Sequence, residues 1–143
     1  MKRLWKELPR DNTKAQWAGL YVTLNGKGSL VLNRVAHKRM GAPEAFHILW
    51  DEANNTIGLK PTYPRIKNAY PVLRSGKHGG KRLNVYRLLT EHGLHIKETL
   101  EFPDAEIDHN GILLLNMRTA VISNRAINHP TRRRASGDRT QVF

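Results

Sequence analysis

The sequence contains no cysteine. This absence excludes a disulfide framework, a thiolate metal site and a thiol nucleophile. Long hydrophobic runs are also missing: an apolar stretch such as residues 111–117 is far shorter than the ~20 residues that a membrane-spanning helix needs. No apolar signal-peptide segment follows the basic first residues. We therefore expect a soluble intracellular protein with no membrane partner, cytoplasmic, and in the nucleoid if the source is bacterial.

Acidic residues are scarce. Among 143 residues there are 12 Asp and Glu against 24 Lys and Arg, which gives a formal net charge of +12. This excess favours a polyanionic partner, and nucleic acid is the first candidate. The length permits one compact domain of ordinary size or two very small ones.

The positive charge is uneven along the chain. Residues 63–83 carry six basic side chains and no acidic one, whereas residues 84–124 carry three basic and six acidic side chains. Composition and charge together predict five segments: a basic N-terminal arm (1–18), a β-α module (19–61), a basic Gly/Pro linker (62–82), a second β-rich region (83–124) and an Arg-rich flexible tail (125–143). Most of the net charge thus lies in the arms and the linker.

Residues 19–61 predict a barrel-like β-β-α-β-β module. Asn33 is positioned to cap a helix over residues 34–40, and Gly41 is positioned to end it. The strands are expected at residues 20–24, 29–32, 45–50 and 56–60. Four short strands and one short helix bury too little surface to be stable alone. Either dimerisation or the second half of the chain must therefore complete the core.

The second half predicts a smaller β-rich region. A short helix ends at Gly93, residues 95–102 alternate like a strand, and Asn110-Gly111 is a strong hairpin signal before a strand over residues 112–116. The predicted fold class is therefore α+β, mostly β.

Part of the first module resembles a known family. The run from Val22 to Asn33, a short helix ending in Met40-Gly41 and the run from Ile57 to Pro61 resemble the AbrB/MazE/SpoVT-type DNA-binding domain, over about a third of the chain. In that family two chains interlock as a swapped-hairpin dimer, and basic residues near the hairpin and the helix contact DNA. The resemblance implies a homodimer or higher homo-oligomer. It also implies DNA contacts for Lys27, Arg34, Lys38 and Arg39.

The basic residues of this helix suit a phosphate surface. Arg34 and Lys38 are four residues apart and share one helix face, and Arg34 is the best candidate for a bidentate contact with guanine. The simpler interpretation of each is a solvated helix face. Further candidates for nucleic-acid contacts are Lys77, Lys81, Arg82, Arg132, Arg133 and Arg134. The simpler interpretations are that the first three belong to a plain linker and the last three to a tail that keeps the protein soluble.

Catalytic signatures are weak. The glycine-rich run over residues 76–81 lacks the spacing and the Ser or Thr of a phosphate-binding loop. Asp104, Glu106 and Asp108 would share one face of a strand and could bind a divalent ion in a nuclease, but acids on a solvent-facing edge strand are commoner. We expect no enzyme activity, no cofactor and no metal site.

The leading interpretation is therefore a non-enzymatic DNA-binding protein that regulates transcription. The alternative is a structural or RNA-associated assembly protein, whose basic arms bind RNA or a packaged polyanion.

Overall fold

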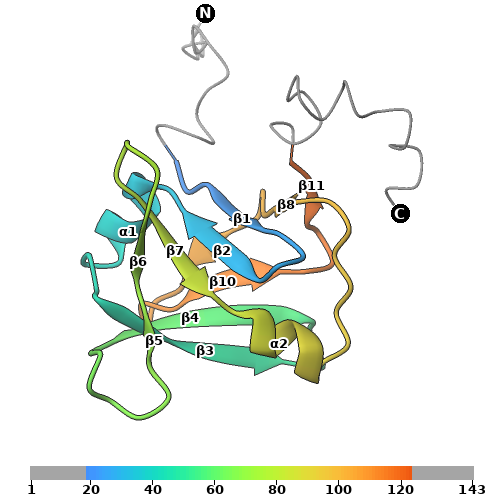
Figure 1. Cartoon of the computed structure of the whole chain (residues 1–143), viewed down its shortest axis with the longest axis horizontal. Helices are drawn as coiled ribbons and strands as arrows, with labels where there is room; N and C mark the ends of the chain where they lie inside the picture. The colour runs from blue at the N-terminus through green and yellow to red at the C-terminus, as the bar shows by residue number, and fades with distance from the viewer. Residues whose placement is uncertain (1–18, 124–143) are drawn as a thin grey trace, which may run out of the picture.

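The computed structural model describes residues 19–123, which form two antiparallel β-sheets and two short helices (Figure 1). This confirms the predicted α+β, mostly β, class. No helix within residues 19–123 combines the length and the apolar character needed to cross a membrane. The N-terminal arm and the Arg-rich tail lie outside the described residues.

The first five elements follow the predicted β-β-α-β-β order. They are β1 (Val22–Leu24), β2 (Ser29–Leu32), α1 (Arg34–Arg39), β3 (Ala45–Asp51) and β4 (Thr56–Thr62). Asn33 caps α1 as expected, because its side-chain oxygen accepts a hydrogen bond from the Ala36 backbone N–H at 3.0 Å. Gly41 lies just beyond the helix with a φ of +89°, a conformation that glycine adopts without a steric penalty. These two residues set the ends of the helix.

The β1–β2 hairpin lies at the centre of a six-stranded sheet with the order β11-β8-β1-β2-β7-β6. Its other strands are β6 (Leu73–Ser75), β7 (Gly80–Asn84), β8 (Leu100–Glu101) and β11 (Val121–Ile122). The second sheet has the order β5-β3-β4-β10-β9, with β5 (Tyr70–Pro71), β9 (Glu106–Ile107) and β10 (Leu113–Asn116). The helix α2 (Tyr86–Glu91) follows β7.

Strands from the second half of the chain complete the core of the first half. Both outer edges of the β1–β2 hairpin are paired, with β8 on one side and β7 on the other, and β10 pairs with β4. Strand alternation directs one face of each sheet inward. The fully buried side chains of the interior come from both halves and include Leu24, Leu30, Phe46, Leu59, Leu83 and Leu113. Of the two alternatives for completing the core, the second half of the same chain therefore supplies the missing strands.

Residues 62–82 differ from the predicted linker. They contain β5, β6 and the first residues of β7, because the edge of β2 offers backbone hydrogen bonds to residues 81–84. The glycine-rich centre forms the turn between β6 and β7, where Gly76 and Gly79 have φ values of +72° and +84°. The flexible-looking sequence is thus a hairpin that extends the six-stranded sheet.

The region after β7 follows the prediction in part. The short helix is present as α2, and Gly93 beyond it has a φ of +62°. The hairpin turn at Asn110-Gly111 is confirmed, since the Asp108 N–H donates to the Ile112 carbonyl at 2.9 Å and β9 pairs with β10. The strand expected over residues 95–102 is reduced to Leu100–Glu101.

Candidate nucleic-acid interface

The pairing of β2 with β7 brings α1 next to the turn between β6 and β7. Leu32 lies opposite Lys81 in this pairing, so the chain leaves β2 directly beside the turn that precedes β7. A Cβ atom added to Gly79 would lie 2.7 Å from Cδ and 3.0 Å from Cγ of Arg34. The Arg34 side chain therefore lies against the backbone of this turn, and Figure 1 shows α1 beside the same end of the hairpin.

This contact places two basic segments that are distant in the sequence, α1 and the β6–β7 hairpin, next to each other. Arg34 and Lys38 share a helix face, and Lys77 is exposed in the turn between β6 and β7. Lys81 lies directly opposite Arg74 in the β6–β7 pair. We refer to these residues, with the exposed Arg39 at the end of α1, as the basic cluster: Arg34, Lys38, Arg39, Arg74, Lys77 and Lys81.

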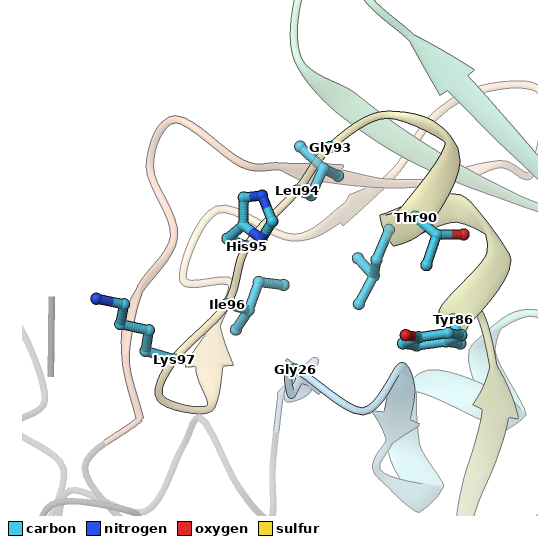
Figure 2. A pocket seen from close by; sticks show the side chains of 9 residues that line it. Gly26, Tyr86, Thr90, Gly93, Leu94, His95, Ile96 and Lys97 are labelled. Carbon is cyan, nitrogen blue, oxygen red and sulfur yellow. The ribbon is translucent and has the colours of Figure 1, made fainter.

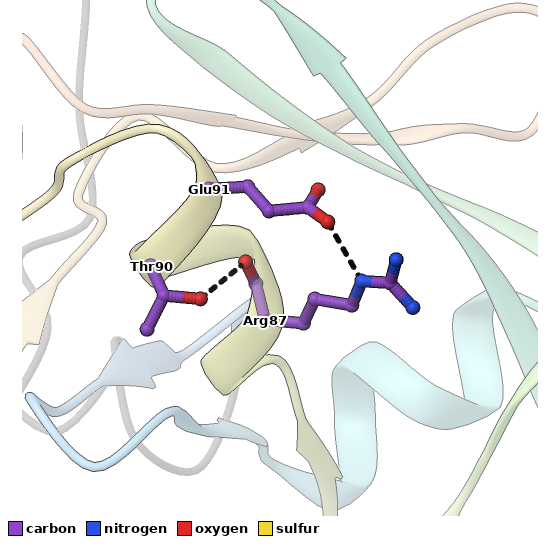
Figure 3. Close-up of polar contacts among 3 residues, drawn as sticks. All are labelled: Arg87, Thr90 and Glu91. Carbon is purple, nitrogen blue, oxygen red and sulfur yellow. Dashed lines mark hydrogen bonds and ion pairs between the residues drawn. The ribbon is translucent and has the colours of Figure 1, made fainter.

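The basic cluster has no neutralising carboxylate among residues 19–123: no ion pair between residues of this range involves any of its six members. Figure 3 shows the contrasting case of Arg87, whose Nε lies 2.7 Å from Oε1 of Glu91. Like charges directly opposite each other on neighbouring strands, such as Lys81 and Arg74, destabilise a sheet. A bound anion would relieve this repulsion.

Part of the charge on α1 also serves the helix itself. Lys38 and Arg39 lie in its last turn, where cations interact favourably with the helix dipole. His37 in the same turn is buried, and its Nε2 donates to the Pro43 carbonyl at 2.7 Å. His37 therefore ties the helix to the loop before β3 and does not belong to the charged surface.

Two predicted site residues lie apart from the basic cluster. Arg82 is opposite Val31 and Leu73, so its side chain emerges on the outer face of the six-stranded sheet. Lys27 lies in the turn between β1 and β2, at the opposite end of β2 from Arg34. The family resemblance implies DNA contacts for four residues, and these four do not lie together. The whole of β2 separates Lys27 from the other three.

The turn that holds Lys27 borders a hollow of about 530 Å³ between α2 and residues 93–97 (Figure 2). A Cβ atom on Gly26 would collide with the Ile96 carbonyl, and one on Gly28 would collide with the backbone of Tyr86. Both glycines therefore permit close packing of the turn against these neighbours. The hollow is lined by Gly26, Tyr86, Leu89, Thr90, Gly93, Leu94, His95, Ile96 and Lys97. It has one lysine in its wall and thus differs in charge from the basic cluster.

The acidic residues considered for nuclease chemistry have a structural role in one case. The Asp108 carboxylate accepts hydrogen bonds from the N–H groups of Asn110 and Ile112, at 2.8 and 2.9 Å. These bonds hold the turn between β9 and β10. Within residues 19–123, no group of three or more His, Asp or Glu side chains is arranged to hold a metal ion.

Sequence reasoning missed one member of the basic cluster as a site residue. Arg74 joins it because β6 pairs with β7, and the antiparallel register about the Gly76–Gly79 turn is the signal that could have found it. Arg132, Arg133 and Arg134 lie outside the described residues.

Comparison with known proteins gives no counterpart for this arrangement. No protein-family model, curated protein or solved structure matches the chain.

Proposed function

We propose that the protein binds duplex DNA through the basic cluster, without catalysing a reaction on it. The observation that carries the proposal is the packing of Arg34 against Gly79, which joins the cations of α1 to those of the β6–β7 hairpin. Six cations on these two neighbouring segments have no carboxylate partner among residues 19–123, and their charge suits a phosphate backbone.

The shape of the basic cluster supports contact with a groove and its flanking phosphates. A helix of six residues is about 9 Å long, and the DNA major groove admits a helix or a two-stranded ribbon. Arg34 is the best candidate for a base contact, while the exposed Lys38 and Lys77 are placed to bind phosphates. The resemblance of residues 19–61 to an AbrB-type domain supports DNA over RNA, and regulation of transcription as the role.

The first experiment compares binding of the full chain to duplex DNA, single-stranded DNA and RNA of equal length by fluorescence anisotropy between 50 and 200 mM salt. Six phosphate contacts predict a loss of affinity of about 10³-fold across this range. We expect the tightest binding to the duplex. Tighter binding to RNA would support the RNA-associated assembly protein instead.

The second experiment separates the basic cluster from net charge. Arg34→Gln plus Lys38→Gln should lower duplex affinity about 10- to 100-fold and reduce the salt slope by about two. Lys60→Gln plus Lys97→Gln removes the same charge from exposed positions outside the basic cluster and should change affinity by less than about threefold. Equal losses in the two variants would contradict the proposal.

A further inference from the structure

The loop between β4 and β5, residues 63–69, exposes two large apolar side chains. Tyr63 is 74% exposed, the highest value among the exposed large apolar side chains of residues 19–123, and Ile66 is 47% exposed. All residues from 63 to 68 are exposed. Single exposed apolar side chains are common on protein surfaces, but grouped ones mark binding sites. We refer to this segment as the β4–β5 loop.

Two consecutive turns fix the backbone of the β4–β5 loop. The Ile66 N–H donates to the Tyr63 carbonyl at 3.0 Å, and the Ala69 N–H donates to the Ile66 carbonyl at 3.1 Å. Nε2 of His47 in β3 donates to the Lys67 carbonyl at 3.1 Å. The first turn brings the Cα atoms of Tyr63 and Ile66 within about 7 Å of each other. The loop therefore holds its two apolar residues close together at fixed positions.

Cations stand on both sides of Ile66. Arg65 precedes it and Lys67 follows it, and both are exposed. No ion pair between residues of the range 19–123 involves either cation, and residues 63–83 contain no acidic side chain. The β4–β5 loop thus combines an exposed aromatic ring with positive charge, which suits a partner that carries flat apolar groups and anions together.

We propose that the β4–β5 loop binds an unpaired base in DNA, with Tyr63 stacked on the base. Ile66 packs beside the stacked pair, while Arg65 and Lys67 bind the adjacent phosphates. Every base has a face on which an aromatic ring can stack, and this combination of stacking and positive charge is how single strands are bound. A lipid surface suits the loop less well, because even one myristoyl chain gives only marginal membrane binding.

The β4–β5 loop lies within reach of a DNA duplex held by the basic cluster. The strands β5 and β6 join the loop to the turn between β6 and β7, and Figure 1 shows the loop and this turn at opposite ends of these strands. The seven residue steps from 69 to 76 span at most about 24 Å. One turn of duplex DNA is about 34 Å long. The inference rests on the proposed DNA binding, to which it adds a preference for unpaired bases.

The test measures binding of the full chain to two DNA molecules by fluorescence anisotropy at constant salt. One is a perfect duplex, and the other is the same duplex with two additional unpaired adenines as a bulge in one strand. Stacking of one base on an aromatic ring predicts that the original chain binds the bulged duplex at least about fivefold more tightly. With 2-aminopurine in place of one bulged adenine, the original chain should quench its fluorescence more than Tyr63→Leu does.

Four variants, each verified as folded by circular dichroism, isolate the ring and the cations. Tyr63→Leu keeps an apolar side chain without the ring, so the preference should fall below about twofold, with unchanged affinity for the perfect duplex. Tyr63→Phe should retain the preference. Tyr86→Leu removes another exposed tyrosine, in α2 outside the loop, and should also retain it. Arg65→Gln plus Lys67→Gln should reduce the salt slope for the bulged duplex by about two.

A preference for the bulged duplex that requires the Tyr63 ring supports base binding. Equal binding of the two DNA molecules, or a preference that survives in Tyr63→Leu, overturns this inference and leaves DNA binding by the basic cluster intact. Binding of the bulged duplex alone would support the inference and contradict the proposed function. No binding to either DNA would overturn both.

Vesicles of phosphatidylcholine with phosphatidylserine form the last arm of the experiment, and we expect no binding that depends on Tyr63. Vesicle binding that Tyr63→Leu abolishes, together with equal binding of the two DNA molecules, would assign the β4–β5 loop to a lipid surface and overturn the proposal.

Discussion

The basic cluster and residues 84–123 use charged side chains in different ways. Residues 84–123 contain six acidic and three basic side chains, and several of these stabilise local structure: Glu91 pairs with Arg87, and Asp108 accepts two backbone hydrogen bonds in its turn. The six cations of the basic cluster pair with no carboxylate of residues 19–123. Charge in the later region thus supports the fold, whereas the basic cluster has no ion pair within residues 19–123.

The two regions nevertheless share one hydrophobic core. The substitution with the largest expected effect on stability tests whether they also unfold together. Leu30 is fully buried and lies opposite Leu24 on one side and Leu83 on the other. We expect Leu30→Ala to lower the free energy of unfolding by about 2–5 kcal/mol. Urea denaturation should show one transition for both regions, monitored by circular dichroism and by tryptophan fluorescence. Two separate transitions would show that the regions fold independently.

The next effect concerns the contact that assembles the basic cluster. Gly79 and Gly76 both have positive φ, but a Cβ would meet Arg34 at Gly79 and open space at Gly76. Each alanine substitution should cost about 1–2 kcal/mol of stability from backbone strain. Gly79→Ala should in addition displace Arg34 and weaken duplex binding, measured by anisotropy.

Gly76→Ala is the matched control for this experiment, since it introduces similar strain in the same turn. Its duplex affinity should stay close to that of the original chain. If both variants lose affinity equally, the Arg34 contact does not organise the binding surface.

A smaller effect is expected in the acidic region. Asp108→Ala removes the acceptor for two backbone N–H groups and should cost about 1–2 kcal/mol of stability in chemical denaturation. Asp104 is exposed, and Asp104→Ala should change stability by less than about 0.5 kcal/mol. Neither variant should weaken DNA binding. A loss of DNA affinity in either variant would show that residues 84–123 contribute to binding, which contradicts the difference drawn between the two regions.

The smallest effect concerns the exposed pair on α2. The hydrogen bond and charge of Arg87 hold the pKa of Glu91 below its ordinary value. A carboxyl group with a lowered pKa in the folded state stabilises the protein above its unfolded pKa, and this contribution is lost as the pH falls through the folded pKa. Arg87→Gln should therefore raise the pKa of Glu91 in an NMR titration. The pKa of Asp51, lowered by hydrogen bonds with Asn54, should stay unchanged; a Glu91 pKa insensitive to Arg87→Gln would contradict the pairing.

Local sequence signals predicted the first module well, and long-range pairing explains the differences. The cap at Asn33 and the stop at Gly41 depend on neighbouring residues, so both could be predicted. Gly80–Asn84 becomes a strand only because β2 presents a partner edge far away in the sequence, and no local pattern encodes that edge. The pairing of β6 with β7 places Arg74 in the basic cluster. The separation of Lys27 from Arg34 likewise emerges only once β2 is seen to lie between them.

The most direct test of the central claim is an NMR titration of the isotope-labelled full chain with duplex DNA, followed by amide chemical shifts. We predict the largest shift changes at residues 34–39 and 74–81, the segments that carry the basic cluster. Residues 84–123 should change little. Shift changes concentrated in residues 84–123, or around the turn that holds Lys27, would contradict DNA binding by the basic cluster.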